Sequence, residues 1–432
     1  MNRILLSILL CGLVVLFPVK SQAVVVDDSV IFQAKDKRYF DGIQFYDNNK
    51  TEEINVIFEV DTNVNTAMKN IGDLYEKNYA IENLTKRNIH VHGNGLNVTN
   101  YGKGGESYGN KDGAAIYNNK YGKLTFCNHI SVALKNISCL ENYGALTFNS
   151  IVDIGQEQDE FPSGNVAIRN FGNLNINSGA SISAVKHING ERRNGVAIYN
   201  SGVLNIDAII SANAPNRIVT SDSVLNSVHI TGDIVHESGT AVTKIKLDGA
   251  GRFNGHVLGS DDNFTLIIDG AYWFVDRMQA DYIVDGVALN NNGAIILPMV
   301  KSYEENVYTN LTLRNFTSDG NFNLNCFNGF DISTNVLASK GSRVNFIGST
   351  PNVTIPVRIN DAISGEVIND TKLLTTDNEV IVATVPADSL MRLRIEEPYL
   401  NVEGGYCKAI IKEKLVGDKR QWCFLGWEFH KY

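Results

Sequence analysis

The stretch Leu140-Glu-Asn-Tyr-Gly-Ala-Leu-Thr-Phe148 returns twice, as Ile168-Arg-Asn-Phe-Gly-Asn-Leu-Asn-Ile176 and as Ile198-Tyr-Asn-Ser-Gly-Val-Leu-Asn-Ile206. A looser copy, Ile116–Phe126, precedes them with two extra residues before its glycine, and Ile81-Glu-Asn83 is a fainter one. The glycines of successive copies lie about 22 to 30 residues apart, which is the length of one solenoid coil. The repeat therefore predicts a stack of similar coils.

Each copy has the period of a β-strand with one buried face. The first apolar residue, the Asn, the Gly, the Leu and the last apolar residue share one parity. Asn-x-Gly is typical of a tight corner, because both residues tolerate unusual backbone angles. With coils stacked about 4.8 Å apart, the asparagine amides can pair as a ladder. We expect a structural corner ladder rather than a ligand site, formed by Asn142, Asn170, Asn200, Gly144, Gly172 and Gly202.

Composition supports an all-β chain. Of 432 residues, 44% are apolar and 20% are charged, which is too apolar for wholesale disorder. The 37 glycines and 8 prolines favour short strands joined by many turns. The net charge of −9 disfavours a nucleic-acid partner, because such proteins need a basic surface.

The N-terminus has the pattern of a secretory signal peptide, residues 1–23. Arg3 precedes the apolar run Ile4–Val19, and Ser21-Gln22-Ala23 supplies small residues for cleavage after Ala23. The run is shorter than the roughly 20 residues that a membrane-spanning helix needs. We therefore expect an exported chain with no transmembrane segment after cleavage, secreted or at the cell surface, with the periplasm as an alternative.

Five cysteines follow the predicted cleavage site, and an odd number leaves at least one thiol unpaired in a monomer. Their pairing is open for most of them: Cys127, Cys139, Cys326, Cys407 and Cys423. A hairpin joining Tyr406–Lys414 to Arg420–Phe429 places Lys412 opposite Cys423, which separates Cys407 from Cys423 by far more than disulfide reach. We expect no bond between these two. Cys139 shares a column with Ala115, Ala167 and Ala197, which predicts a small packing residue. No cysteine has the spacing of a zinc site, so no metal and no cofactor are predicted.

The C-terminal part resembles a known family. The matching segments are Leu266–Val275, Val287–Leu297, Tyr308–Leu324, Asp331–Phe346, Thr371–Pro386, Gly405–Ile411 and Gln421–Leu425. They resemble the passenger domains of pertactin-like autotransporters. The resemblance implies a single-stranded right-handed parallel β-helix with a C-terminal capping hairpin. The predicted divisions are an N-terminal capping segment at 24–75, β-helix coils at 76–300 and pertactin-like coils with a cap at 301–432.

Members of that family continue into a membrane-inserted translocator barrel after such a hairpin. Here the charged residues Lys412, Glu413 and Lys414, and those at 418–420, interrupt any lipid-facing band. We expect no translocator barrel within this chain.

Catalysis has weak support in the sequence. Insertions at Gly155–Gly164 and at His187–Gly195, the second with Arg192-Arg193, predict projecting loops. The nearest catalytic candidates are Asp261-Asp262 and His90-Val-His92, and neither has a partner that repeats at coil distance. The Gly-x-Ser-x-Gly spacing occurs once, at Gly105-Glu-Ser-Tyr-Gly109 in a Gly-rich segment, but no strand-to-helix nucleophile elbow is predicted in this all-β chain. The chain is therefore predicted not to be an enzyme; a polysaccharide lyase or hydrolase is the alternative.

The family resemblance favours an exported interaction module, such as an adhesin. The expected partner is a host or matrix protein or a glycan. A structural envelope protein is a further alternative, since a fold alone does not fix a function.

Overall fold

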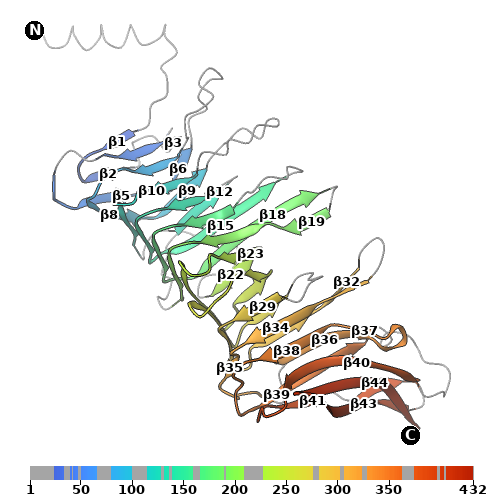
Figure 1. Ribbon diagram of the computed structural model, residues 1–432. Helices are drawn as coiled ribbons and strands as arrows, with labels where there is room; N and C mark the ends of the chain where they lie inside the picture. Colours follow the sequence, from blue (N-terminus) through green and yellow to red (C-terminus); the bar gives the residue numbers. More distant parts are fainter. Residues whose placement is uncertain are drawn as a thin grey trace, which may run out of the picture.

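The computed structural model describes residues 24–33, 39–40, 42–46, 50–65, 79–99, 114–127, 131–135, 139–158, 166–188, 191–208, 227–275, 282–301, 306–323, 328–361, 374–396, 399–402 and 405–431. The predicted signal peptide and Cys326 lie outside these residues. Short strands stack along one long axis from the N-terminal to the C-terminal part of the molecule (Figure 1).

Three parallel sheets run along this axis. The first consists of β1 (Val24–Val26), β4 (Ile43–Phe45), β7 (Ile81–Asn83), β10 (Ile116–Asn118), β13 (Leu140–Asn142), β16 (Val166–Asn170), β20 (Val196–Asn200), β23 (Asp233–His236) and β26 (Val257–Leu258). The second consists of β2 (Val30–Phe32), β5 (Ile54–Phe58), β8 (Asn88–Gly93), β11 (Lys123–Phe126), β14 (Ala145–Phe148), β17 (Asn173–Ile176), β21 (Val203–Ile206), β24 (Val242–Asp248), β27 (Phe264–Asp269), β30 (Val287–Asn290) and β35 (Thr317–Ser318).

The third sheet is the longest. Its main path is β3 (Tyr39–Phe40), β6 (Thr62–Asn65), β9 (Gly95–Thr99), β12 (Ser131–Lys135), β15 (Ile151–Gln158), β18 (Ala180–Ile188), β22 (Val228–Thr231), β25 (Arg252–Asn254), β28 (Tyr272–Phe274), β31 (Ala294–Leu297), β36 (Gly329–Asn335), β39 (Thr354–Asp361) and β41 (Arg392–Glu396). Two short strands pair off this path, β19 (Glu191–Asn194) and β37 (Lys340–Gly341). Successive strands in the chain belong to successive sheets, so one strand from each sheet makes one coil. The molecule is a parallel β-helix; the hand of the coil stays a prediction.

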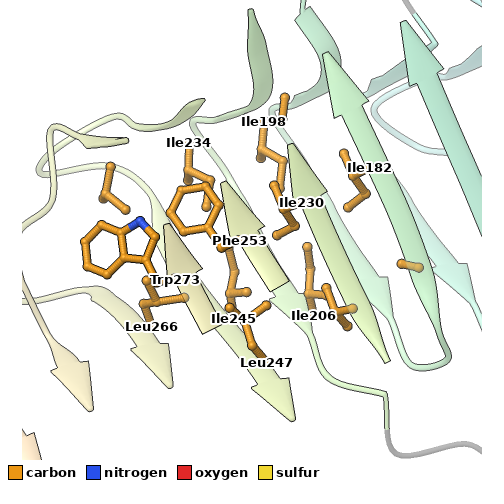
Figure 2. Close-up of a cluster of buried hydrophobic side chains, with 14 of the residues drawn as sticks. Ile182, Ile198, Ile206, Ile230, Ile234, Ile245, Leu247, Phe253, Leu266 and Trp273 are labelled. Atoms are coloured by element: carbon orange, nitrogen blue, oxygen red, sulfur yellow. The ribbon is translucent and has the colours of Figure 1, made fainter. Parts of the chain in front are cut away.

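The core fills the space between the three sheets. Inward side chains on neighbouring coils lie over one another, and Figure 2 shows such a stack from Ile182 to Trp273. Phe126 and Phe148 stack at 4.9 Å between ring centroids, and Phe253 and Trp273 at 5.6 Å. This packing follows from the sequence parity, because residues two apart in a strand point to the same face.

The C-terminal end is a different sheet. It comprises β29 (Tyr282–Asp285), β34 (Asn310–Arg314), β38 (Arg343–Ile347), β40 (Leu374–Pro386), β44 (Lys419–Lys431), β43 (Gly405–Val416) and β42 (Tyr399–Val402). The pairing is parallel up to β40 and antiparallel beyond it. A separate pair, β32 (Met299–Lys301) and β33 (Asn306–Tyr308), and a 3-10 turn, η2 (Val336–Ala338), complete the elements.

The predicted hairpin is confirmed in its register. Strands β43 and β44 turn at Gly417, and Lys412 pairs with Cys423 while Cys407 pairs with Phe429. The indole Nε1 of Trp427 donates to buried Asp361 Oδ2 at 3.2 Å, which ties the hairpin to the last coils. The insertion predicted as a loop at His187–Gly195 is wrong in part: β18 and β19 pair antiparallel across it. The Gly155–Gly164 insertion starts as an extension of β15, and residues 159–165 lie outside the described part.

Thiol labelling checks the cysteine environments. Cys139, Cys407 and Cys423 are buried and Cys127 is half-buried; none of these four described cysteines forms a disulfide, and the pKa of each thiol is raised, mainly by burial. Because thiolate is the reactive form, alkylation of native protein should label Cys127 first. Peptide mapping after a second label in denaturant should find the other three only in the second step. Recovery of a linked 407–423 peptide would contradict the expected absence of that bond.

Candidate interaction face

A buried amide ladder forms the corner between the first two sheets. Asn142 Nδ2 donates to Asn170 Oδ1 and Asn170 Nδ2 donates to Asn200 Oδ1, each at 2.8 Å. The ladder starts two coils earlier than the clear repeats, since Asn83 donates to Asn118 and Asn118 to Asn142, again at 2.8 Å. All five side chains are fully buried. The glycines of the predicted corner sit directly against the backbone of the preceding coil.

The ladder continues with different residues where the Asn-x-Gly repeat ends. His236 takes the register position after Asn200, and Asn200 Nδ2 donates to Thr243 Oγ1 at 2.8 Å. The same hydroxyl lies 2.8 Å from His236 Nδ1, and His236 Nε2 lies 3.0 Å from Asp261 Oδ1. Because Nε2 faces a carboxylate it carries the proton, so Thr243 donates its hydrogen to the neutral Nδ1. The hydrogen bonds thus run in one direction from Asn83 to Asp261.

The carboxylate of Asp261 is held by hydrogen bonds from within the protein. Its two oxygens accept four hydrogen bonds, from His236 Nε2, Ser238 Oγ and the backbone N–H groups of Gly239 and Asn263. Burial alone would raise the pKa of Asp261, but these bonds outweigh it and hold that pKa well below its ordinary value. His236, on the preceding coil, is a partner of Asp261 that the sequence pattern alone does not indicate. The acceptor capacity of Asp261 is fully used.

The other catalytic candidate, His90 with His92, does not form a single site, because the two side chains have separate contacts. His90 Nε2 lies 3.7 Å from Glu53 Oε2, and Cys127 Sγ lies 3.6 Å from His92 Nε2. The two contacts are on neighbouring coils of the second sheet. Within the described residues, no three His, Cys, Asp or Glu side chains are placed to hold a metal ion.

The environment of Asp285 should make the stability of the folded protein fall as the pH rises. Its carboxylate is 3% exposed, Oδ2 lies 3.3 Å from Arg314 and Oδ1 has no hydrogen-bond partner in the described part of the chain. Burial raises its pKa more than Arg314 lowers it, and Asp262 and Asp261 raise it further. The folded state therefore holds the proton more tightly than the unfolded state, and stability is lost as pH rises from the ordinary aspartate pKa through the folded value.

Replacing Asp285 with Asn should remove the loss of stability that comes from ionising this buried carboxyl. We expect the Asp285→Asn variant to have a higher Tm than the wild type at pH 7 and no advantage near pH 3, as measured by calorimetry. Asp262→Asn, at an exposed position of the same corner, is the control. A lower Tm for Asp285→Asn at pH 7 would show that the Arg314 ion pair outweighs burial.

An aromatic column lies on the outer surface of the first sheet. Its rings are Tyr79, Tyr117, Tyr143, Phe171 and Tyr199. Adjacent centroids are 4.5, 5.8, 4.8 and 5.8 Å apart in that order. The first and third pairs are stacked and the others are tilted by 52°. None of the five is fully buried, and Phe171 is 39% exposed. Stacked rings are held in place by their neighbours, so this surface is ordered before any partner arrives.

Two glutamate carboxylates accept hydrogen bonds from the tyrosines of the column. The hydroxyls of Tyr79 and Tyr143 donate to Glu141 at 3.3 and 3.2 Å, and that of Tyr199 donates to Glu237 at 2.7 Å. Burial, followed by the Glu141 charge, raises the pKa of Tyr143 to about 12. The tyrosines therefore remain protonated donors, and the face combines neutral rings with negative charge.

The aromatic column was not predicted from the sequence. The signal lies in the same repeat, because aromatic residues occupy the outward position before Asn in Tyr117 and Tyr199, and the middle of Asn-x-Gly in Tyr143 and Phe171. These positions point outward, so the inward parity that predicts the coils does not single them out, although they recur with the same coil length.

Among the described residues, no helix is long and apolar enough to cross a membrane. No protein-family model and no curated protein matches the chain. Among solved structures, it is similar to the Hap adhesin of Haemophilus influenzae, at 11% identity and a TM-score of 0.33. The match covers 92% of this chain and 33% of that chain, so the chain spans about one third of that structure's length. This similarity assigns no family; the parallel β-helix rests on the strand pairing itself.

Proposed function

We propose that the chain is an exported, non-catalytic interaction protein of the adhesin type, which binds a macromolecular partner through the aromatic column. The observation that carries this proposal is the continuous set of outward rings from Tyr79 to Tyr199. Tyr and Phe are enriched at protein interfaces, and rings already held in place lose little side-chain freedom on binding. The predicted signal peptide supports an exported location.

A non-catalytic role fits the environments of Asp261 and Asp285, two neighbouring carboxylates. A polysaccharide hydrolase needs a carboxyl pair that can reach a sugar. Asp261 accepts four internal hydrogen bonds and Asp285 is 3% exposed. Neither carboxylate is available to a polymer on the surface.

Binding assays with a surface variant test the proposal. Cell fractionation locates the native protein, and the purified protein is applied to host cells, matrix proteins and a glycan array. The variant Tyr117→Ser, Tyr143→Ser, Phe171→Ser should lose most binding, because it removes three central rings. Val203→Ser, Val242→Ser is the matched control, since both valines are 44% exposed on the second sheet. Equal binding by the two variants, with unchanged Tm, would overturn the proposal.

A further inference from the structure

Two tyrosines at the start of the aromatic column are in direct contact. The rings of Tyr79 and Tyr117 stack with their centroids 4.5 Å apart and 23° between their planes. Tyr117 lies in β10, and Tyr79 comes just before β7, the strand with which β10 pairs, so the two rings belong to neighbouring coils. Both side chains are half-buried, which leaves part of each ring open to solvent. The strand pairing thus holds two phenols together at one fixed place.

A third tyrosine extends this contact. Tyr143 is the next ring after Tyr117, with the two centroids 5.8 Å apart. Phe171 follows and separates Tyr143 from Tyr199. A phenol loses one electron far more easily than a benzene ring does, so an electron lost from one of the first three tyrosines can be replaced from its neighbour. Tyr117 is the ring that has a tyrosine on each side.

Glu141 supplies the other requirement for oxidising a phenol, an acceptor for its proton. A phenol that loses an electron becomes a strong acid, so its proton leaves as well. Glu141 is 9% exposed; its Oε2 accepts from the Tyr79 hydroxyl at 3.3 Å and its Oε1 from the Tyr143 hydroxyl at 3.2 Å. Burial, followed by the Glu141 charge, raises the pKa of Tyr79 and of Tyr117. The phenols therefore stay protonated until they are oxidised, and a base is then in contact with Tyr79.

We propose that Tyr79 and Tyr117 form an oxidative modification site, at which hydrogen peroxide and a haem peroxidase join the two rings as dityrosine. Each phenol gives up one electron and its hydroxyl proton, and the proton of Tyr79 passes to Glu141. The two radicals form a C–C bond between the carbons ortho to their oxygens, and the hydrogens on those carbons move to the oxygens. The two electrons and two protons released reduce one peroxide molecule to two waters. This modification requires no binding partner, so it stands apart from the proposed function.

The site is tested on purified protein, treated with hydrogen peroxide and a haem peroxidase at low protein concentration. Dityrosine fluorescence should appear in the monomer, and peptide mapping should recover Tyr79 and Tyr117 in one linked pair that is lighter by two hydrogens. Tyr117→Phe and Tyr79→Phe should each lose this product, because phenylalanine forms no phenoxyl radical. Tyr121→Phe is the matched control and should keep it, since Tyr121 is 55% exposed and has lysines over its ring.

Glu141→Gln tests the proton acceptor. Glutamine keeps the shape and still accepts hydrogen bonds, but it is a far weaker base, so the initial rate of dityrosine formation should fall by about tenfold. Glu237→Gln is the control, because Glu237 accepts from Tyr199, beyond Phe171 in the column. It should leave the rate unchanged.

Stability gives a second measurement. A bond between neighbouring coils restricts the unfolded chain, so the treated wild type should have a higher Tm than treated Tyr117→Phe. Dityrosine found only in dimers, or linked only through the exposed Tyr46 and Tyr121, would overturn the site. Equal rates for Glu141→Gln and the wild type would overturn the role of Glu141 as proton acceptor and leave the cross-link standing.

Discussion

Gly172→Ala is expected to destabilise the β-helix by more than about 3 kcal/mol, beyond the usual range for overpacking, or to prevent folding. A Cβ at this position would lie 2.2 Å from Gly144 O and 2.5 Å from Tyr143 C, both backbone atoms. The two coils cannot separate locally, because Asn173 N–H donates to Gly144 O at 2.7 Å and Gly172 N–H donates to Asn142 O at 3.1 Å. Moving the two coils apart to make room for the Cβ would therefore break these backbone hydrogen bonds.

Gly155→Ala is the matched control. A Cβ at Gly155 has no atom within 4 Å, so this substitution should change stability by less than about 1 kcal/mol, in the stabilising direction through the unfolded state. Urea unfolding and the soluble yield of both variants are measured side by side. Should Gly172→Ala unfold at the same urea concentration as Gly155→Ala, the coils would be less tightly stacked at this corner than the structure indicates.

Asn170→Ala is expected to destabilise the protein by roughly 3 kcal/mol. The amide nitrogen of Asn170 donates to Asn200 Oδ1 at 2.8 Å and to Val203 O at 2.9 Å, while its oxygen accepts from Asn142. Buried groups that lose a partner cost about 1–3 kcal/mol each, and Asn142 and Asn200 are both fully buried. Asn205→Ala, on the outward face of β21, should be nearly neutral and serves as the control.

Asn170→Asp separates hydrogen bonding from packing. The aspartate has the same shape but, when ionised, offers no donor to Asn200 Oδ1, Gly172 O or Val203 O. It should be less stable than Asn170→Ala at pH 7, and the gap should narrow as pH falls, because a protonated carboxyl regains one donor. An Asp variant as stable as the wild type at pH 7 would mean that the amide donors do not stabilise this corner.

Much of the fold can be predicted from the sequence, because few other residue types can replace the Asn and Gly that form the corner of each repeat. Asn142, Asn170 and Asn200 share a spacing and a parity, and these fix the coil, the corner and the inward face together. The alternation of apolar and polar residues also predicts strands at Ser227–Thr231, Thr243–Leu247 and Phe264–Ile268, and β22, β24 and β27 occupy these positions.

The parts that could not be predicted depend on contacts between unlike residues. His236 replaces an asparagine, and only the strand register shows that it takes the position after Asn200. The partnership of Asp261 with His236 joins residues that share no motif. The aromatic column was hidden for another reason: a Tyr in an alternating strand looks like ordinary surface until neighbouring coils place the next ring above it.

The amide ladder also has an electrical consequence. Each asparagine donates toward the C-terminal end of the rod, so the side-chain dipoles point the same way and add, as peptide dipoles do in a helix. The positive end of this row faces Asp261, and its negative end is Asn83 Oδ1, which accepts from Thr85 N–H at 3.1 Å. Reversing one amide would bring like groups together on both sides, so the row holds its orientation as a unit. The buried corner of the β-helix thus contains a row of aligned amide dipoles, and the ionised carboxylate of Asp261 lies at the positive end of that row.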